Sequence, residues 1–119
     1  MKRDLELVRE ILLAVENFDA PRGTIDLDLP GRDPELVSYH VKLMHEAGLL
    51  EGMDLTTRAG FCWLPTSLTW TGHEFLDAAR NDTVWNKALS TLKDKAPSVP
   101  FEIVKAVVIK TCKDFFGLG

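Results

Sequence analysis

One helix with both ends marked in the sequence, followed directly by a hairpin pattern, is the feature that most constrains this fold. Asp33 supplies an N-cap acceptor, and Pro34 occupies a first helical position where its missing N–H costs nothing. Gly48 suits the left-handed residue that ends a helix. The sequence therefore predicts a helix over 34–47. Its outer face is expected to carry Glu35, Ser38, Lys42 and His45, with Tyr39 at the edge.

A β-hairpin is predicted immediately after this helix. Residues 49–52 (LLEG) open it, its tip falls near residues 57–60, and the return strand covers about 61–70. Pro65 interrupts the return strand, which suits a strand at the edge of a sheet.

The segments before the helix predict another helix and a strand. Residues 3–17 place apolar side chains three and four positions apart, as one face of an amphipathic helix requires. Residues 24–29 (TIDLDL) alternate strictly between polar and apolar, which predicts a half-buried strand.

Helices are expected to complete the chain. Thr71 and Glu74 have the spacing of a capping box, so a helix should begin at Gly72, and Asp82 should cap a further segment. A last amphipathic helix is expected at 100–116.

This order of helix, strand, helix, β-hairpin and helix, with an additional C-terminal amphipathic helix, predicts a small α+β domain. Residues 1–96 would form the main body. Residues 97–119 would form a packing or dimerisation helix of the same domain.

Composition limits the possible functions. The 119 residues suit one domain, and no apolar run approaches the 20 residues that a membrane span needs. Two cysteines, Cys62 and Cys112, make no disulfide framework, so a reduced, cytoplasmic protein is expected. Residues 1–60 hold seven basic and twelve acidic residues, which argues against a generic polyanion binder.

Two resemblances to known families extend these expectations. The motif EAGLLEG, a hairpin and then LTWTGHEFL resemble winged-helix proteins, and VSYHVKLMHEAGLL is similar to the recognition helix of arsenic-repressor-type regulators. The motifs MKRDLELVREIL, SYHVKLMHEAGLLEG and LTWTGHEFLDAARNDTVW resemble a domain-of-unknown-function family of small bacterial and phage proteins. The winged-helix resemblance implies a winged-helix-like α+β fold, in which the helix at 34–47 is the recognition helix and the β-hairpin is the wing. The sequence departs from that pattern between Asn17 and Asp33, where there is little room for the usual middle helix.

The leading functional expectation is a small, regulator-like protein that binds double-stranded DNA. Its expected contacts are Ser38, Tyr39 and Lys42 in the major groove and Arg58 at the hairpin tip. The alternative is a protein-interaction module that keeps the winged-helix scaffold without binding DNA, which the acidic first half favours.

Other sites find little support in the sequence. His40 and His45 lie on different faces of their helix, and no close His or Cys pair suggests a metal site. No nucleophile has an evident base partner, so neither an enzyme nor a cofactor is expected. Trp63, Trp70 and Trp85 are expected in the core. The helix at 100–116 is expected to pack on its own domain or to form a homodimer.

Overall fold

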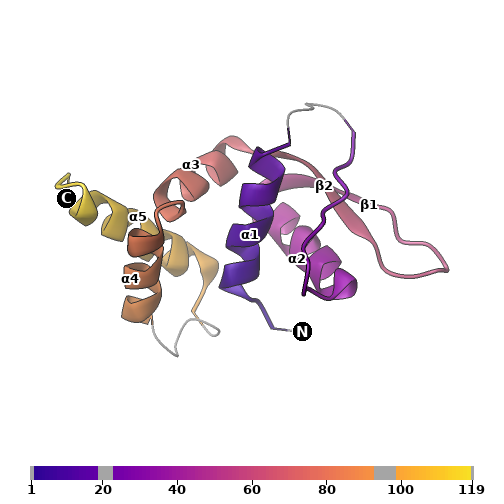
Figure 1. The fold of residues 1–119 in the computed structure, drawn as a ribbon, viewed down its shortest axis with the longest axis horizontal. Helices are drawn as coiled ribbons and strands as arrows, with labels where there is room; N and C mark the ends of the chain where they lie inside the picture. The colour runs from indigo at the N-terminus through magenta and orange to yellow at the C-terminus, as the bar shows by residue number, and fades with distance from the viewer. Residues whose placement is uncertain (1, 19–22, 93–98, 119) are drawn as a thin grey trace. The chain divides into compact units, whose positions relative to one another are not determined.

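The computed structural model describes residues 2–18, 23–92 and 99–118. Within them the chain forms five helices and one two-stranded antiparallel sheet (Figure 1). It divides into two compact units, one from Arg3 to His73 and one that begins at Glu74. The fold is α+β, as predicted, and it is compatible with a small winged-helix-like domain plus a C-terminal helix. The predicted division between residues 96 and 97 lies outside the described residues.

Helix α1 (Leu5–Glu16) confirms the first predicted helix. The carboxylate of Asp4 accepts hydrogen bonds from the N–H groups of Glu6 (3.0 Å) and Leu7 (3.2 Å), which satisfies two donors of the first turn. The buried stripe of α1 consists of Leu7, Val8, Ile11, Leu12 and Val15.

Helix α2 (Pro34–Glu46) has the ends that the sequence predicts. The side chain of Asp33 accepts a hydrogen bond from the N–H of Glu35, and Gly48 follows the helix with a φ of +77°. A left-handed residue at this position is typical of helix ends. The buried side chains of α2 are Ser38, His40, Val41 and Met44.

The predicted strand at 24–29 is wrong, although its burial pattern is right. Ile25 is buried and Leu27 and Leu29 are half-buried, whereas the polar residues between them are exposed. A ladder requires successive backbone hydrogen bonds. In the described part of this segment, the backbone bond to the sheet runs from Ile25 N–H to the Pro65 carbonyl (2.8 Å). The segment is therefore an extended chain beside the sheet, and the described residues between α1 and α2 contain no helix.

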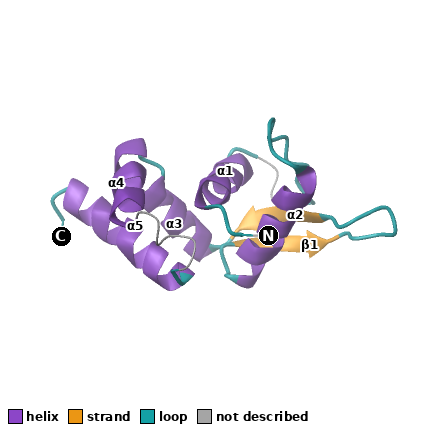
Figure 2. Ribbon diagram, turned by 90° about the horizontal axis from the view of Figure 1, so that it is seen from below, coloured by secondary structure: helices purple, strands orange, loops and turns teal. Residues whose placement is uncertain are grey.

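Strands β1 (Leu50–Asp54) and β2 (Trp63–Leu68) form the predicted hairpin. They pair antiparallel, with an irregularity between Glu51 and Gly52. Reciprocal backbone hydrogen bonds of 3.1 Å between Thr57 and Gly60 close the tip where the sequence predicts it. The connecting loop extends clear of α1 and α2 (Figures 1 and 2).

The side of β2 that faces away from β1 is covered. The hydroxyl of Ser38 accepts a hydrogen bond from Trp63 N–H (3.1 Å) and donates one to the Trp63 carbonyl (3.4 Å). The Pro65 carbonyl accepts from Ile25, and proline has no N–H to donate. Pro65 thus occupies an edge strand, as predicted.

Helix α3 (Trp70–Ala79) begins two residues earlier than expected, because its cap is Thr69 and not Thr71. The hydroxyl of Thr69 accepts a hydrogen bond from the N–H of Gly72 (3.0 Å), the third helical residue. The expected capping box is therefore wrong. Trp70 consequently leaves the alternation of the strand, and its side chain is 80% exposed, which corrects the prediction that it lies in the core.

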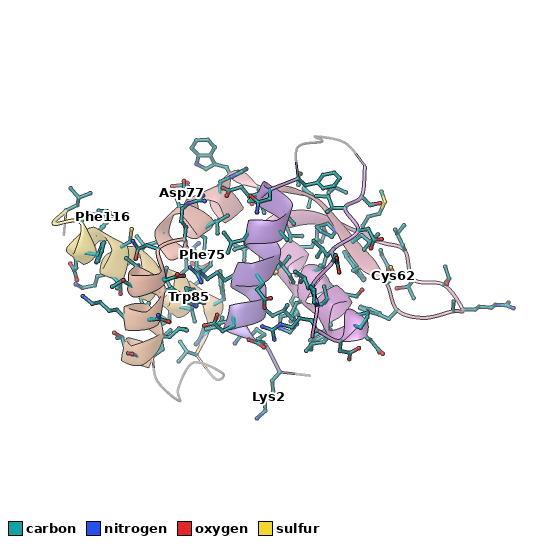
Figure 3. The ribbon with its side chains drawn as sticks, viewed as in Figure 1. Lys2, Cys62, Phe75, Asp77, Trp85 and Phe116 are labelled. Atoms are coloured by element: carbon teal, nitrogen blue, oxygen red, sulfur yellow. The ribbon has the colours of Figure 1, made fainter. Side chains whose placement is uncertain are left out.

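The second unit is helical. Helices α4 (Asp82–Leu92) and α5 (Phe101–Phe115) pack together, and Asn81, not Asp82, caps α4 through the N–H groups of Thr83 and Val84. The ring of Phe75 lies 6.4 Å from that of Trp85 and 5.3 Å from that of Phe101. Phe75 and Trp85 are labelled in Figure 3. The remaining core side chains of this unit include Leu76, Val84, Ala88, Val104 and Val108.

Candidate interaction surface of α2 and the hairpin

Ser38 does not lie on the outer face of α2, which corrects the prediction from sequence. Its side chain is only 7% exposed, and its hydroxyl is engaged with both backbone groups of Trp63. This donor and acceptor are already used inside the chain. Ser38 therefore positions the hairpin on α2 and is not available to a base edge.

Tyr39 and Lys42 do reach the surface of α2, where both are half-buried. The charged residues that share this side of the helix are Glu35 and Glu46, both exposed. Lys42 is thus the single basic side chain among the described residues of the exposed face, against two carboxylates. This face therefore lacks the cluster of cations on which phosphate affinity depends.

Lys42 also acts on the hairpin. The pKa of Asp54 lies below its ordinary value, mainly because the hydroxyl of Thr56 hydrogen-bonds to its carboxylate. The N–H of Thr56, 2.9 Å from the same carboxylate, has the next largest effect, and the charge of Lys42 lowers the pKa further. Lys42 has the smallest of these effects on Asp54, and the larger ones that lower its pKa come from Thr56 within the hairpin itself.

Arg58 lies at the tip of the hairpin and is exposed, as the sequence predicts. The other exposed charges of the hairpin are Glu51 and Asp54, which are acidic. The helix face and the hairpin together carry more acidic than basic groups.

His45 joins α2 to the hairpin and was expected to face outward. Its Nδ1 accepts a hydrogen bond from Gly52 N–H (3.0 Å), and its ring centroid lies 5.5 Å from that of Trp63. Together with Ser38, it fixes the hairpin against the helix. The sequence could not reveal this role, because both partners belong to a later segment of the chain.

Exposed apolar side chains on the hairpin are a feature that was not predicted from the sequence. Met53, Leu55 and Phe61 are 49%, 39% and 36% exposed. Met53 and Leu55 alternate with polar residues and share one face of the hairpin, whereas Phe61 is in phase with Trp63 on the opposite face. The hairpin extends past the core at this end, so neither face of the alternation is buried there. Grouped apolar exposure is typical of contact surfaces.

A groove of about 680 Å³ lies beside these residues in the first unit. The loop at residues 26–35 forms one wall, the chain at residues 59–64 forms the other, and Val37 and Ser38 also line it. Cys62, which directly precedes β2 and is labelled in Figure 3, is one of the residues of the second wall.

Arg32 is a basic residue that lines this groove, but its guanidinium is paired with carboxylates of the chain itself. Its guanidinium hydrogen-bonds to the carboxylate of Glu10 and, at 3.1 Å, to that of Asp4. The hydrogen bond with Glu10 raises the pKa of Arg32. The described part of the groove therefore has no uncommitted basic side chain.

Metal sites and membrane spans are both missing from residues 2–18, 23–92 and 99–118. In these ranges no group of three or more His, Cys, Asp or Glu side chains is placed to hold a metal ion. No helix in the same ranges is long and apolar enough to cross a membrane.

The arrangement defines a small α+β protein with a helix-and-hairpin surface. Residues 2–98 match the family described as "Hypothetical protein (DUF2513)", and the chain belongs to this family. An "Uncharacterized protein" of Haemophilus influenzae (strain ATCC 51907 / DSM 11121 / KW20 / Rd) is 43% identical over 108 residues, which cover 90% of this chain and 92% of that protein. The resemblance to a domain-of-unknown-function family is thus confirmed. No solved structure is significantly similar to the chain.

Proposed function

We propose that this protein is a protein-interaction module on a winged-helix-like scaffold, and that the outer end of its hairpin contacts the partner. The observation that carries the proposal is the exposure of Met53 and Leu55, which lie two residues apart on the same face of the hairpin. Solvated apolar groups of this kind gain free energy when a partner covers them.

Charge supports a protein partner over DNA. Residues 3–73 contain six Lys or Arg and twelve Asp or Glu, a net charge of −6 for the unit that carries the helix and hairpin. Binding to duplex DNA depends on clustered cations that release counterions from the phosphates. Here Lys42 shares its helix face with the exposed carboxylates of Glu35 and Glu46, and the other exposed charges of the hairpin that carries Arg58 are acidic.

Crosslinking in cells tests the proposal. A photoreactive benzophenone amino acid replaces Leu55, and the control position is Asn17, which is exposed at the end of α1. We expect a discrete protein adduct from position 55, lost when Met53→Asp is added, and none of comparable yield from position 17. Equal yields from both positions, or an adduct indifferent to Met53→Asp, would contradict the proposal.

DNA binding is the second candidate function, and one observation favours it. Helix α2 leads directly into a hairpin whose tip carries Arg58, the order in which winged-helix proteins present a recognition helix and a wing. Tyr39, Lys42 and Arg58 would be the contacts. Titration of the protein with random-sequence duplex DNA at low and high salt decides between DNA binding and the proposed protein interaction. Under this candidate, Lys42→Ala lowers the salt slope of binding by about 1; under our proposal no salt-sensitive binding is seen.

A homodimer through residues 100–116 and a cytoplasmic location stay predictions. Ile103 and Phe115 on helix α5, and Phe116 directly after it, are exposed and would be available to a second copy.

A further inference from the structure

The groove in the first unit combines apolar walls with acidic groups at its rim. Leu27, Leu29, Trp63 and Leu64 line it and are half-buried, so their apolar surfaces are only partly covered by the chain itself. Phe61 adds an exposed ring. A groove of this kind accepts apolar side chains of a ligand.

The carboxylates around the groove are not compensated by the described residues. Asp26, Asp28 and Glu35 are exposed, and no described side chain forms a salt bridge with them. Arg32, which also lines the groove, is held by Glu10 and Asp4. The groove therefore presents negative charge toward whatever enters it, which disfavours phosphate and favours a cation.

The backbone of the groove shows how a ligand would be recognised. The hydroxyl of Ser38 hydrogen-bonds to the outward N–H and carbonyl of Trp63, and the N–H of Ile25 donates to the carbonyl of Pro65. A peptide therefore cannot join β2 as an added strand at these residues. Recognition must come from side chains instead: ammonium or guanidinium groups at the carboxylates, and apolar groups against the walls. A cation near the rings of Trp63 or Phe61 gains further attraction.

We propose that this groove binds a segment of a protein partner in which Lys or Arg alternates with apolar residues. The inference rests on the proposed function and deepens it, because it states the composition of the partner segment and the place where that segment binds. Charge complementarity with Asp26, Asp28 and Glu35 selects this occupant over an acidic segment or a nucleic acid.

Protection of Cys62 gives a direct test with an internal control. Both cysteines of the chain are free and half-buried, but only Cys62 lines the groove. The probes are an eight-residue peptide that alternates Leu and Arg, and a second one with Glu in place of Arg. Alkylation by iodoacetamide is followed by mass spectrometry on the full chain. We expect the Leu–Arg peptide to slow modification of Cys62 at least threefold and to leave that of Cys112 unchanged, and the Leu–Glu peptide to do neither.

A matched pair of charge variants separates the groove from general attraction to an acidic protein. Asp26→Asn with Asp28→Asn should weaken the Leu–Arg peptide about tenfold, the combined loss expected for two partly exposed charge pairs. Glu46→Gln with Glu51→Gln removes the same charge from exposed residues outside the groove lining and should change affinity less than twofold. Equal weakening by both pairs, or no protection of Cys62, would overturn the inference.

Failure here is distinguishable from failure of the proposed function. If the groove is empty but the hairpin binds a partner, the Leu55 adduct persists in the Asp26→Asn, Asp28→Asn variant while Cys62 stays unprotected, and only the groove inference falls. If position 55 gives no specific adduct, the proposed function falls.

Discussion

The backbone N–H of Asp4 donates a hydrogen bond of 2.8 Å to Nε2 of His40, and so ties the start of α1 to the middle of α2. Because Nε2 is the acceptor, the proton of the neutral ring resides on Nδ1, which donates to the carbonyl of Leu36 (3.0 Å). The His40 side chain is fully buried. His40 is thus a hydrogen-bonded core histidine, with both ring nitrogens engaged inside the chain.

Replacing His40 should destabilise the chain. His40→Ala leaves the Asp4 N–H without its acceptor and opens a cavity, so we expect a loss of about 2–3 kcal/mol in the free energy of unfolding, measured with urea. His73→Ala is the control, because His73 is exposed, and it should shift stability by less than about 0.5 kcal/mol. A His40→Ala chain with an unchanged midpoint would contradict the assignment.

Ser38 should reveal its role through the hairpin. Ser38→Ala removes the partner of both backbone groups of Trp63, so the Trp63 amide should exchange with solvent faster and stability should fall by about 1–2 kcal/mol. Amide exchange followed by NMR measures this. Ser67→Ala, on the same strand, should leave the Trp63 rate unchanged; a similar acceleration in both variants would mean that the hydroxyl of Ser38 is not the cause.

Gly72 should resist a change that usually helps a helix. Alanine is ordinarily favoured over glycine inside a helix. At Gly72, however, a Cβ atom would lie 1.8 Å from the carbonyl oxygen of Leu49, which is backbone and cannot yield easily. We expect Gly72→Ala to lower stability by about 2–4 kcal/mol, seen as a lower midpoint of thermal unfolding. Thr71→Ala, at an exposed site one residue away, should be close to neutral, and a stabilising Gly72→Ala would refute the close approach.

Asp54 should titrate below its ordinary pKa of 3.8. A carboxylate whose pKa is lower in the folded chain contributes stability above its unfolded pKa, and that contribution is lost as the pH falls through the folded value. Thr56→Val removes the hydroxyl that acts most strongly on Asp54, so the pKa should rise toward 3.8, measured by the carboxyl carbon shift in NMR. Thr66→Val, on β2, should leave this titration unchanged. If the pKa of Asp54 is the same in the Thr56→Val variant, the hydroxyl of Thr56 has no such effect.

Self-association through α5 requires a surface substitution for its test. Val108 is fully buried in the second unit, so a charge there would disrupt folding instead of an interface. Ile103→Asp changes an exposed side chain, and it should dissociate any dimer seen by sedimentation, whereas the neighbouring Glu102→Gln should not. A dimer that survives Ile103→Asp uses another surface.

Features fixed by neighbouring residues were predictable from the sequence. Asp33, Pro34 and Gly48 define the ends of α2 through bonds and backbone angles within a few positions, and the tip at residues 57–60 closes on itself. Local chemistry decides such features, so one sequence is enough to predict them.

Features that depend on distant partners were not predictable. Residues 24–29 alternate like a strand, but whether they pair depends on β2, some forty positions later, where Ser38 already occupies Trp63. Trp70 follows the phase of β2 only until Thr69 starts a helix. The groove lies between a loop before α2 and the return arm of the hairpin. No spacing of residues in the sequence predicts that these two segments lie side by side.

The covered side of β2 has a consequence for the behaviour of the protein at high concentration. A small sheet with an open flank is a template on which identical chains can stack strand upon strand into insoluble fibrils. Here Pro65, which has no N–H, the hydroxyl of Ser38 and the N–H of Ile25 close the outer side of β2 at Trp63 and Pro65, so fibril growth cannot begin on β2 at these residues.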